Sequence, residues 1–130
     1  MVALFAATLA SLVIGHPVPV ECGPLPGHMG WYDQAHDRIV IADWLCPHLE
    51  ADPSKGGIVL QRFAYAALVV VHEAEHAAGI RDEHEANCEA VRDLKPLLKL
   101  LRVPKAVAIV SYAKQVAQNQ APPYGGKCRK

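Results

Sequence analysis

The amino-acid sequence predicts a small α+β domain that is mostly helical. A nearly unbroken apolar stretch from Ile58 to Val71 is typical of a buried helix. Helical patterns are also found near Glu83 and from Lys105 to Gln118, whereas the β-branched segment Arg38–Ala42 indicates a short strand. The chain has 130 residues, of which 52% are hydrophobic, so it can build one modest core.

The first fifteen residues have the composition of an export signal. Val2 to Ile14 is apolar except for Thr8 and Ser11, and the stretch is too short for a standard transmembrane helix. No basic residue precedes it and no Ala-x-Ala site follows it. We expect residues 1–15 to be a signal peptide or an N-terminal anchor, and residues 16–130 to form a single domain of an exported protein.

Four cysteines are spread along the chain, and no two of them form a Cys-x-x-Cys pair. An even number of cysteines in a small exported protein favours disulfide bonds. We expect one bridge from Cys46 to Cys88, tying the strand to a helix, and a second from Cys22 to Cys128, tying the two ends together. The alternative is four free, buried thiols in a cytosolic protein.

The elements before the long helix are short. Pro and Gly residues predict an irregular lead-in over residues 16–30. Residues 30–35 are expected to pair with the strand Arg38–Ala42. A helical turn over residues 43–50 and a loop over residues 51–57 complete this half of the chain.

The long helix is predicted to run from Ile58 to Ala78, because Gly79 is typical of a position just past a helix end. Its last turns carry His72-Glu73-x-x-His76, the HExxH pattern. Histidines four residues apart share one helix face and can bind one zinc ion, with the glutamate beside them as general base. A metal would also remove the cost of burying these polar groups. The alternative is an ordinary solvated helix end.

A catalytic zinc usually has a third protein ligand. Asp82 has the spacing of the third ligand in metzincins, but these enzymes also have a downstream Met-turn, and both methionines here lie upstream. Asp82-x-x-Glu85 instead fits a capping box that opens a second helix. Glu83 is the better candidate, because it shares one face of that helix with small residues: Ala86, Asn87 and Ala90.

The combination of HExxH with Glu83-x-x-Ala86-Asn87-x-x-Ala90 resembles the gluzincins, zinc peptidases whose third ligand is a glutamate. The likeness is nearest to their small bacterial and phage members, and its specific part covers residues 68–90. The resemblance implies a zincin-like fold with one zinc ion on His72, His76 and Glu83, and Glu73 as general base. The link from His76 to Glu83 is short, which leaves Asp82, Glu85 and His84 as alternative third ligands.

The last third of the chain is basic. Residues 92–130 contain nine basic residues and one acidic residue, against four basic and twelve acidic residues before them. Pro96 is expected to interrupt the second helix and Pro104 to start a third. The basic residues of the second helix form a stripe: Arg92, Lys95, Lys99 and Arg102. We expect a solvated face, with weak contact to an acidic membrane surface as the alternative.

These observations favour a zinc-dependent peptidase that acts on a peptide or protein substrate. Glu73 would take a proton from the attacking water. By the resemblance, the strand Arg38–Ala42 would pair with an extended substrate. No phosphate-binding loop or nucleic-acid motif is found. Two alternatives are a zinc-stabilised binding or structural module without catalysis, and a small disulfide protein in which the motif is accidental.

Overall fold

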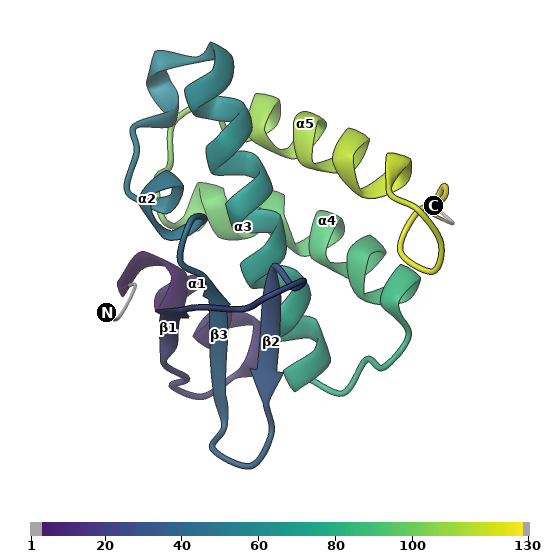
Figure 1. Ribbon diagram of the computed structural model, residues 1–130. Helices are drawn as coiled ribbons and strands as arrows, with labels where there is room; N and C mark the ends of the chain where they lie inside the picture. The colour runs from purple at the N-terminus through teal and green to yellow at the C-terminus, as the bar shows by residue number, and fades with distance from the viewer. Residues whose placement is uncertain (1–3, 129–130) are drawn as a thin grey trace.

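The computed structural model describes residues 4–128 and has the predicted α+β, mostly helical architecture over that range (Figure 1). Residues 1–3, which belong to the predicted export signal, lie outside it. The elements follow the order α1 (Leu4–Ile14), β1 (Val20–Gly23), β2 (Gly30–Asp33), β3 (Arg38–Ala42), α2 (Cys46–Leu49), the 3₁₀ turn η1 (Pro53–Lys55), α3 (Gly57–Ala77), α4 (Glu83–Leu100) and α5 (Ala106–Asn119).

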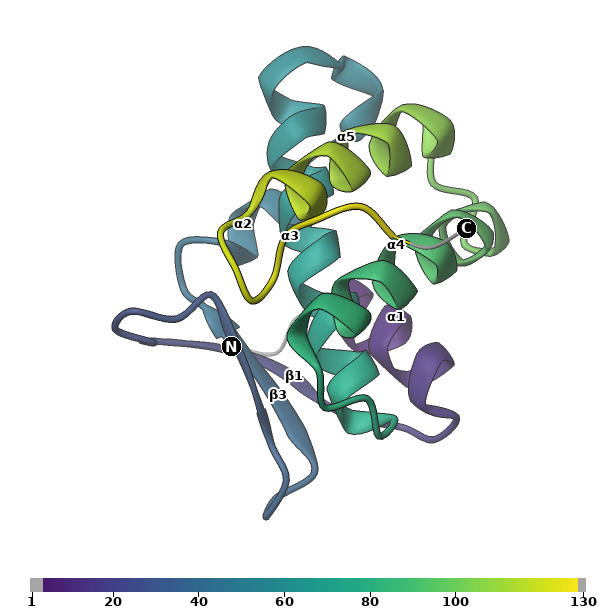
Figure 2. The ribbon, with the colours of Figure 1, turned by 90° about the vertical axis from the view of Figure 1, so that its right-hand side faces the viewer.

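Helix α3 lies at the centre of the molecule, with α1, α4 and α5 packed around it and the sheet beside it (Figures 1 and 2). Its buried side chains include Leu68, Val70 and Val71, all at most 2% exposed. By length and hydropathy α3 could cross a membrane, but two-thirds of its most apolar window, 67%, is buried inside the protein. Its apolar character is accounted for by this central position.

The sheet has three strands, with β3 in the middle. Strand β1 pairs with β3 in parallel and β2 pairs with β3 antiparallel. The strands at Arg38–Ala42 and within residues 30–35 were predicted, but β1 was not, because Pro17 and Pro19 made its surroundings resemble an irregular segment. The expectation that Arg38–Ala42 pairs with a substrate is wrong, since both of its edges are already hydrogen-bonded.

Helix α1 is packed into the core. Ala6, Leu9 and Ala10 are fully buried, and the ring of Phe5 lies 5.7 Å from that of Phe63 on α3. The apolar residues that predicted an export signal therefore also fit a folded helix of this domain. Cleavage of this segment on export stays a prediction.

Helix α4 continues through Pro96, contrary to the expected interruption. Pro96 is exposed, whereas Leu94 and Leu98 lie fully buried on the opposite face. Packing of these leucines outweighs the hydrogen bond that proline cannot donate. The basic side chains at 92, 95, 99 and 102 are all exposed, as expected for a solvated face.

Two disulfides are present, but the expected pairing is wrong: Cys22 joins Cys46, and Cys88 joins Cys128. Cys22 lies opposite Ile41 on β3, and Cys46 begins α2 just after that strand, so the two are brought together locally. After α5 the chain turns back toward α4, which brings Cys128 to Cys88 (Figure 2). The unpredicted strand β1 and the returning tail are the reasons for the error.

Candidate metal centre

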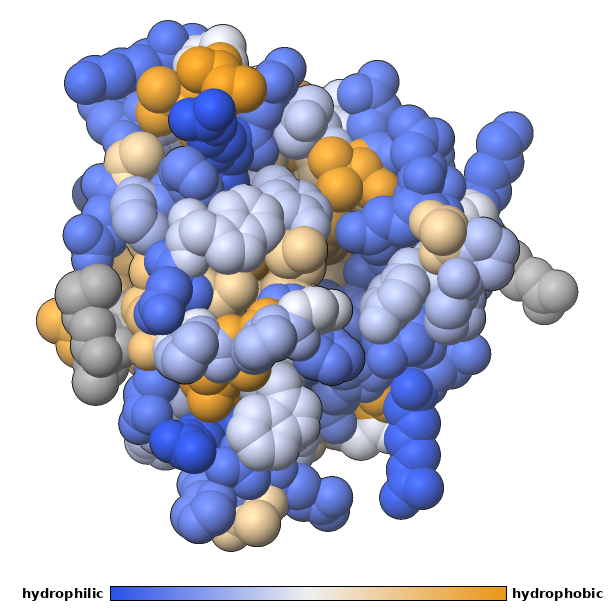
Figure 3. Space-filling model, in the orientation of Figure 1, coloured by the Kyte–Doolittle hydropathy of each residue, from blue (hydrophilic) through white to orange (hydrophobic). Residues whose placement is uncertain are grey.

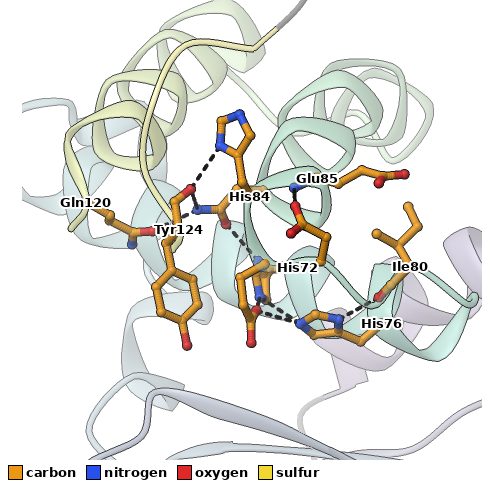
Figure 4. A network of polar contacts seen from close by, with 10 residues as sticks. His72, His76, Ile80, His84, Glu85, Gln120 and Tyr124 are labelled. Atoms are coloured by element: carbon orange, nitrogen blue, oxygen red, sulfur yellow. Dashed lines mark hydrogen bonds and ion pairs between the residues drawn. The ribbon is translucent and has the colours of Figure 1, made fainter. Parts of the chain in front are cut away.

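Three predicted ligands come together where α3 ends and α4 begins (Figure 4). Nε2 of His72 lies 3.0 Å from Nε2 of His76, and Oε1 of Glu83 lies 2.8 Å from each nitrogen. The chain reverses between the helices at Gly79, whose φ of 113° is unfavourable for other residues. In the described part of the chain, no other group of three or more His, Cys, Asp or Glu side chains is as close.

Hydrogen bonds fix the orientation of both imidazoles. Nδ1 of His72 lies 2.7 Å from Oδ1 of Asn87, and Nδ1 of His76 lies 2.7 Å from the carbonyl oxygen of Ile80. The Asn87 amide cannot be reversed, because its Nδ2 donates to the carbonyl oxygen of Tyr124 at 3.3 Å. Each Nδ1 therefore carries a hydrogen, and in the neutral form of each ring Nε2 keeps a lone pair directed at the cluster.

When both rings are neutral, the cluster joins three acceptor atoms, and acceptors at separations of 2.8–3.0 Å repel unless a proton or a metal ion lies among them. Zinc binds nitrogen and oxygen at about 2.0–2.1 Å in tetrahedral geometry, which places ligand atoms roughly 3.3 Å apart. An adjustment of about 0.5 Å in these side chains would reach that spacing. The donor set and its spacing therefore fit a zinc ion with three protein ligands.

The two histidines have different titration behaviour. Burial lowers the pKa of His72, and the nearby His76 lowers it further. Burial also acts to lower the pKa of His76, but the Ile80 carbonyl and the Glu83 carboxylate outweigh it, and the net shift is upward. His72 is thus held in the neutral form that a metal requires.

Glu73 lies beside the cluster and is buried, with 9% of its surface exposed. Burial raises the pKa of its carboxyl group to about 7, although a hydrogen bond from the Tyr32 backbone acts in the opposite direction. Strand β2 passes so close that a Cβ added at Gly30 would lie 2.9 Å from Cγ of Glu73 and 3.0 Å from Cγ1 of Val69. Glycine at position 30 therefore allows the strand to approach the glutamate.

The alternative third ligands have other contacts. Asp82 is the N-cap of α4, and its carboxylate accepts a hydrogen bond from the backbone N–H of Glu85 at 2.8 Å. Glu85 is exposed. Nδ1 of His84 lies 3.3 Å from the Tyr124 carbonyl oxygen, on the C-terminal tail (Figure 4). Only Glu83 of these four is in the cluster with the histidines.

Two hollows flank the centre. One, of about 370 Å³, lies along α3 between the segment Gly27–Gly30 and the tail residues 120–124. The other, of about 660 Å³, lies between β2 and the turn from Ala77 to Glu83. Glu73 and Tyr124 line both hollows, so a ligand that passes from one to the other would pass the cluster.

Sequence reasoning missed the contribution of the tail. The Asn87 amide connects His72 to this tail, since its Nδ2 donates to Oε1 of Gln120 at 2.8 Å as well as to Tyr124. The ring of Tyr124 lies 5.9 Å from that of His72. The Ala-Asn pair in the motif drew attention to Asn87, but nothing in the local sequence indicates which distant residues it binds.

Comparison with models of protein families, with curated proteins and with solved structures found no match. The resemblance to gluzincins therefore rests on the motif residues, and the function is argued from the site itself.

Proposed function

We propose that this protein is an exported, zinc-dependent peptidase of the gluzincin type, with His72, His76 and Glu83 as ligands. The observation that carries the proposal is the convergence of three acceptor atoms whose hydrogen-bond partners leave their lone pairs facing one another. The two disulfides support a location in an oxidising compartment.

A zinc ion bound there would supply a Lewis acid that polarises a carbonyl group and acidifies a water molecule. Glu73 is one residue along the helix from His72 and points about 100° away from it, so it flanks the ligands instead of joining them. Its carboxylate would accept a proton from the attacking water and return it to the leaving amine. The buried, poorly solvated position of Glu73 suits this exchange.

Strand β2 offers a place for an extended substrate. It is an edge strand, and Met29 just before it accepts a hydrogen bond from Ala42 through its carbonyl oxygen. Because backbone groups alternate along an antiparallel ladder, the backbone groups of Gly30 and Tyr32 then point away from β3, where the Tyr32 N–H already donates to Glu73. Gly30 lines both hollows beside the cluster. A peptide added along β2 would lie next to Glu73, by the common mode of strand addition.

The first test is the metal content of the purified protein. We expect about one equivalent of zinc, lost in His72→Ala, because two remaining ligands make an incomplete shell. Asp82→Ala serves as a control that leaves all three ligands in place. A wild-type protein without zinc after reconstitution would exclude the proposal.

The second test is Glu73→Gln, which keeps the shape of the side chain but cannot accept the proton. We expect it to retain zinc and fold while peptide hydrolysis falls by roughly a hundredfold to ten-thousandfold. Cleavage of a diverse peptide library, read by mass spectrometry, measures this. Undiminished cleavage by Glu73→Gln would rule out the mechanism. Zinc binding without any cleavage by the wild type would identify a non-catalytic zinc module.

A further inference from the structure

A row of aromatic side chains extends the groove beyond the metal centre. Tyr65 on α3 lines the 370 Å³ hollow beside the cluster and also two further hollows, of about 400 Å³ and 330 Å³. The first of these lies against α5 at Tyr112 and Val116, and the second reaches Trp44 and Ile58. Tyr65 lines all three hollows, and Gln120 lines the first two, so the hollows are neighbours along α3.

The far end of this path exposes large apolar surfaces. The ring of Trp44 stacks on that of Tyr65, with centroids 6.2 Å apart and planes 29° from parallel. Trp44 is 52% exposed and Ile58 is 56% exposed. We call Trp44, Tyr65, Tyr112 and Ile58 the aromatic shelf. Exposed apolar side chains that gather beside a hollow are characteristic of binding surfaces. The face drawn in Figure 3 has small hydrophobic patches, coloured orange, among mostly hydrophilic residues, coloured blue.

The charges on the shelf limit what it can bind. Arg62 lines the outermost hollow, and among residues 4–128 no acidic residue lines either of the two outer hollows. A ligand with a large apolar side chain next to a carboxylate would therefore match the shelf, whereas a basic ligand would gain no ion pair there.

The distance to the metal centre fits a peptide. Because a helix rises about 1.5 Å per residue, Tyr65 lies about 10 Å along α3 from His72, and Ile58 lies about 21 Å from it. An extended chain covers about 3.3 Å per residue. A peptide at the metal centre would thus reach the near end of the shelf after about three residues and the far end after about six.

We propose that the aromatic shelf binds a large apolar side chain of the substrate, with an acidic neighbour, three to six residues from the cleaved bond. The inference rests on the proposed peptidase function. The shelf adjoins the hollow at the candidate metal centre through Tyr65, which favours the distal part of the substrate as occupant over a second copy of this chain.

The test compares cleavage of a diverse peptide library by the zinc-loaded wild type and Trp44→Ala. We expect the wild type to prefer apolar residues three to six positions from the cleaved bond on one side, and Trp44→Ala to lose that preference. For peptides long enough to reach the shelf, kcat/KM should fall about tenfold, mainly through KM, since tenfold corresponds to a modest apolar contact. Peptides that end two residues from the cleaved bond are too short to reach the shelf, so wild type and Trp44→Ala should cleave them with the same kcat/KM.

Leu100→Ala is the matched control, because Leu100 is 66% exposed and does not line any of these hollows. Arg62→Glu should reverse the preference for acidic neighbours. If wild type and Trp44→Ala prefer the same residues around the cleaved bond, the inference is overturned and the peptidase function remains. Self-association of the wild type that is abolished in Trp44→Ala would also overturn the inference, because a second copy of the chain would then occupy the shelf.

A readout independent of hydrolysis uses zinc-loaded Glu73→Gln as the binding protein. The same library is captured by this protein and by its Trp44→Ala derivative, and the bound peptides are identified. Weaker capture by the derivative of peptides with an apolar residue beside an acidic one supports binding at the shelf. If the wild type also cleaves no peptide, the peptidase function fails and the binding role of the shelf remains. Equal capture overturns the inference.

Discussion

At the scale of single residues, the choice between Glu83 and Asp82 is the sharpest question, because they are neighbours with different contacts. Glu83→Ala should abolish tight zinc binding, since its oxygen is the third atom of the cluster. Asp82→Ala should keep zinc and lose only an N-cap, which costs about 1 kcal/mol of stability. Zinc titration and denaturant unfolding of both variants measure these effects. Loss of zinc in Asp82→Ala alone would show that the third ligand is misassigned.

Glu75 is a buried acidic residue that is not part of the candidate metal centre. Its Oε2 has no hydrogen-bond partner in the described part of the chain. Burial raises its pKa to about 9, with Asp93 and Glu89 adding to the shift. The folded protein therefore holds a proton that the unfolded chain releases near pH 4.5. The contribution of this carboxyl group to the free energy of unfolding is fully present below that pH and is lost as the pH rises toward about 9.

Glu75→Gln should remove this dependence, because an amide needs no proton to stay neutral. We expect the variant to be more stable than the wild type above neutral pH, with the difference growing up to about pH 9. Denaturant unfolding at pH 5, 7 and 9 of zinc-free protein checks the trend. A difference that shrinks as the pH rises would contradict it. Glu50→Gln is a control at an exposed position that does not contribute to the shift.

At the scale of elements, the two disulfides have different neighbours and should have different effects on the metal. Cys88–Cys128 closes a loop with a sequence separation of 40, and Cys22–Cys46 one of 24. On chain entropy alone, each contributes about 3 to 4 kcal/mol. Only the first holds the tail that meets Asn87.

We therefore expect Cys88→Ser with Cys128→Ser to weaken zinc binding by roughly ten- to a hundredfold, the usual effect of disturbing a group that orients a ligand. Cys22→Ser with Cys46→Ser should lose similar stability and keep its zinc affinity. Competition with a zinc chelator, measured well below the unfolding transition, compares the two. Equal zinc affinities in both pairs of variants would show that the tail does not support His72.

The elements that sequence predicts well are those with strong local signals. Helix α3 was predicted to within one residue, because its apolar run ends in a glycine, and β3 was predicted at its observed bounds. The cluster of His72, His76 and Glu83 follows from helical spacing and a short turn. Local signals do not reveal contacts between distant segments. Strand β1, the disulfide partners and the tail beside Asn87 could not be predicted, because all three depend on such contacts.

At the scale of the whole molecule, α1 belongs both to the expected export signal and to the folded core. A chain that begins at His16 would lack the fully buried Ala6, Leu9 and Ala10. Removal of even one buried leucine side chain costs about 2–5 kcal/mol, so we expect the shortened chain to unfold at much lower denaturant concentration. Intact mass of the exported protein shows whether this segment is retained. A shortened chain as stable as the full one would show that α1 is dispensable to the core.

The three candidate metal ligands lie close together in sequence, with His72 and Glu83 separated by 11 positions. Closing so short a loop costs little chain entropy compared with the contacts made by the tail. If zinc binds as proposed, it would be able to bind an α3–α4 hairpin before α5 and the tail have docked, and would then act as a folding nucleus. The metal would then fix the turn first, and the groove would be completed last, when the tail closes over it.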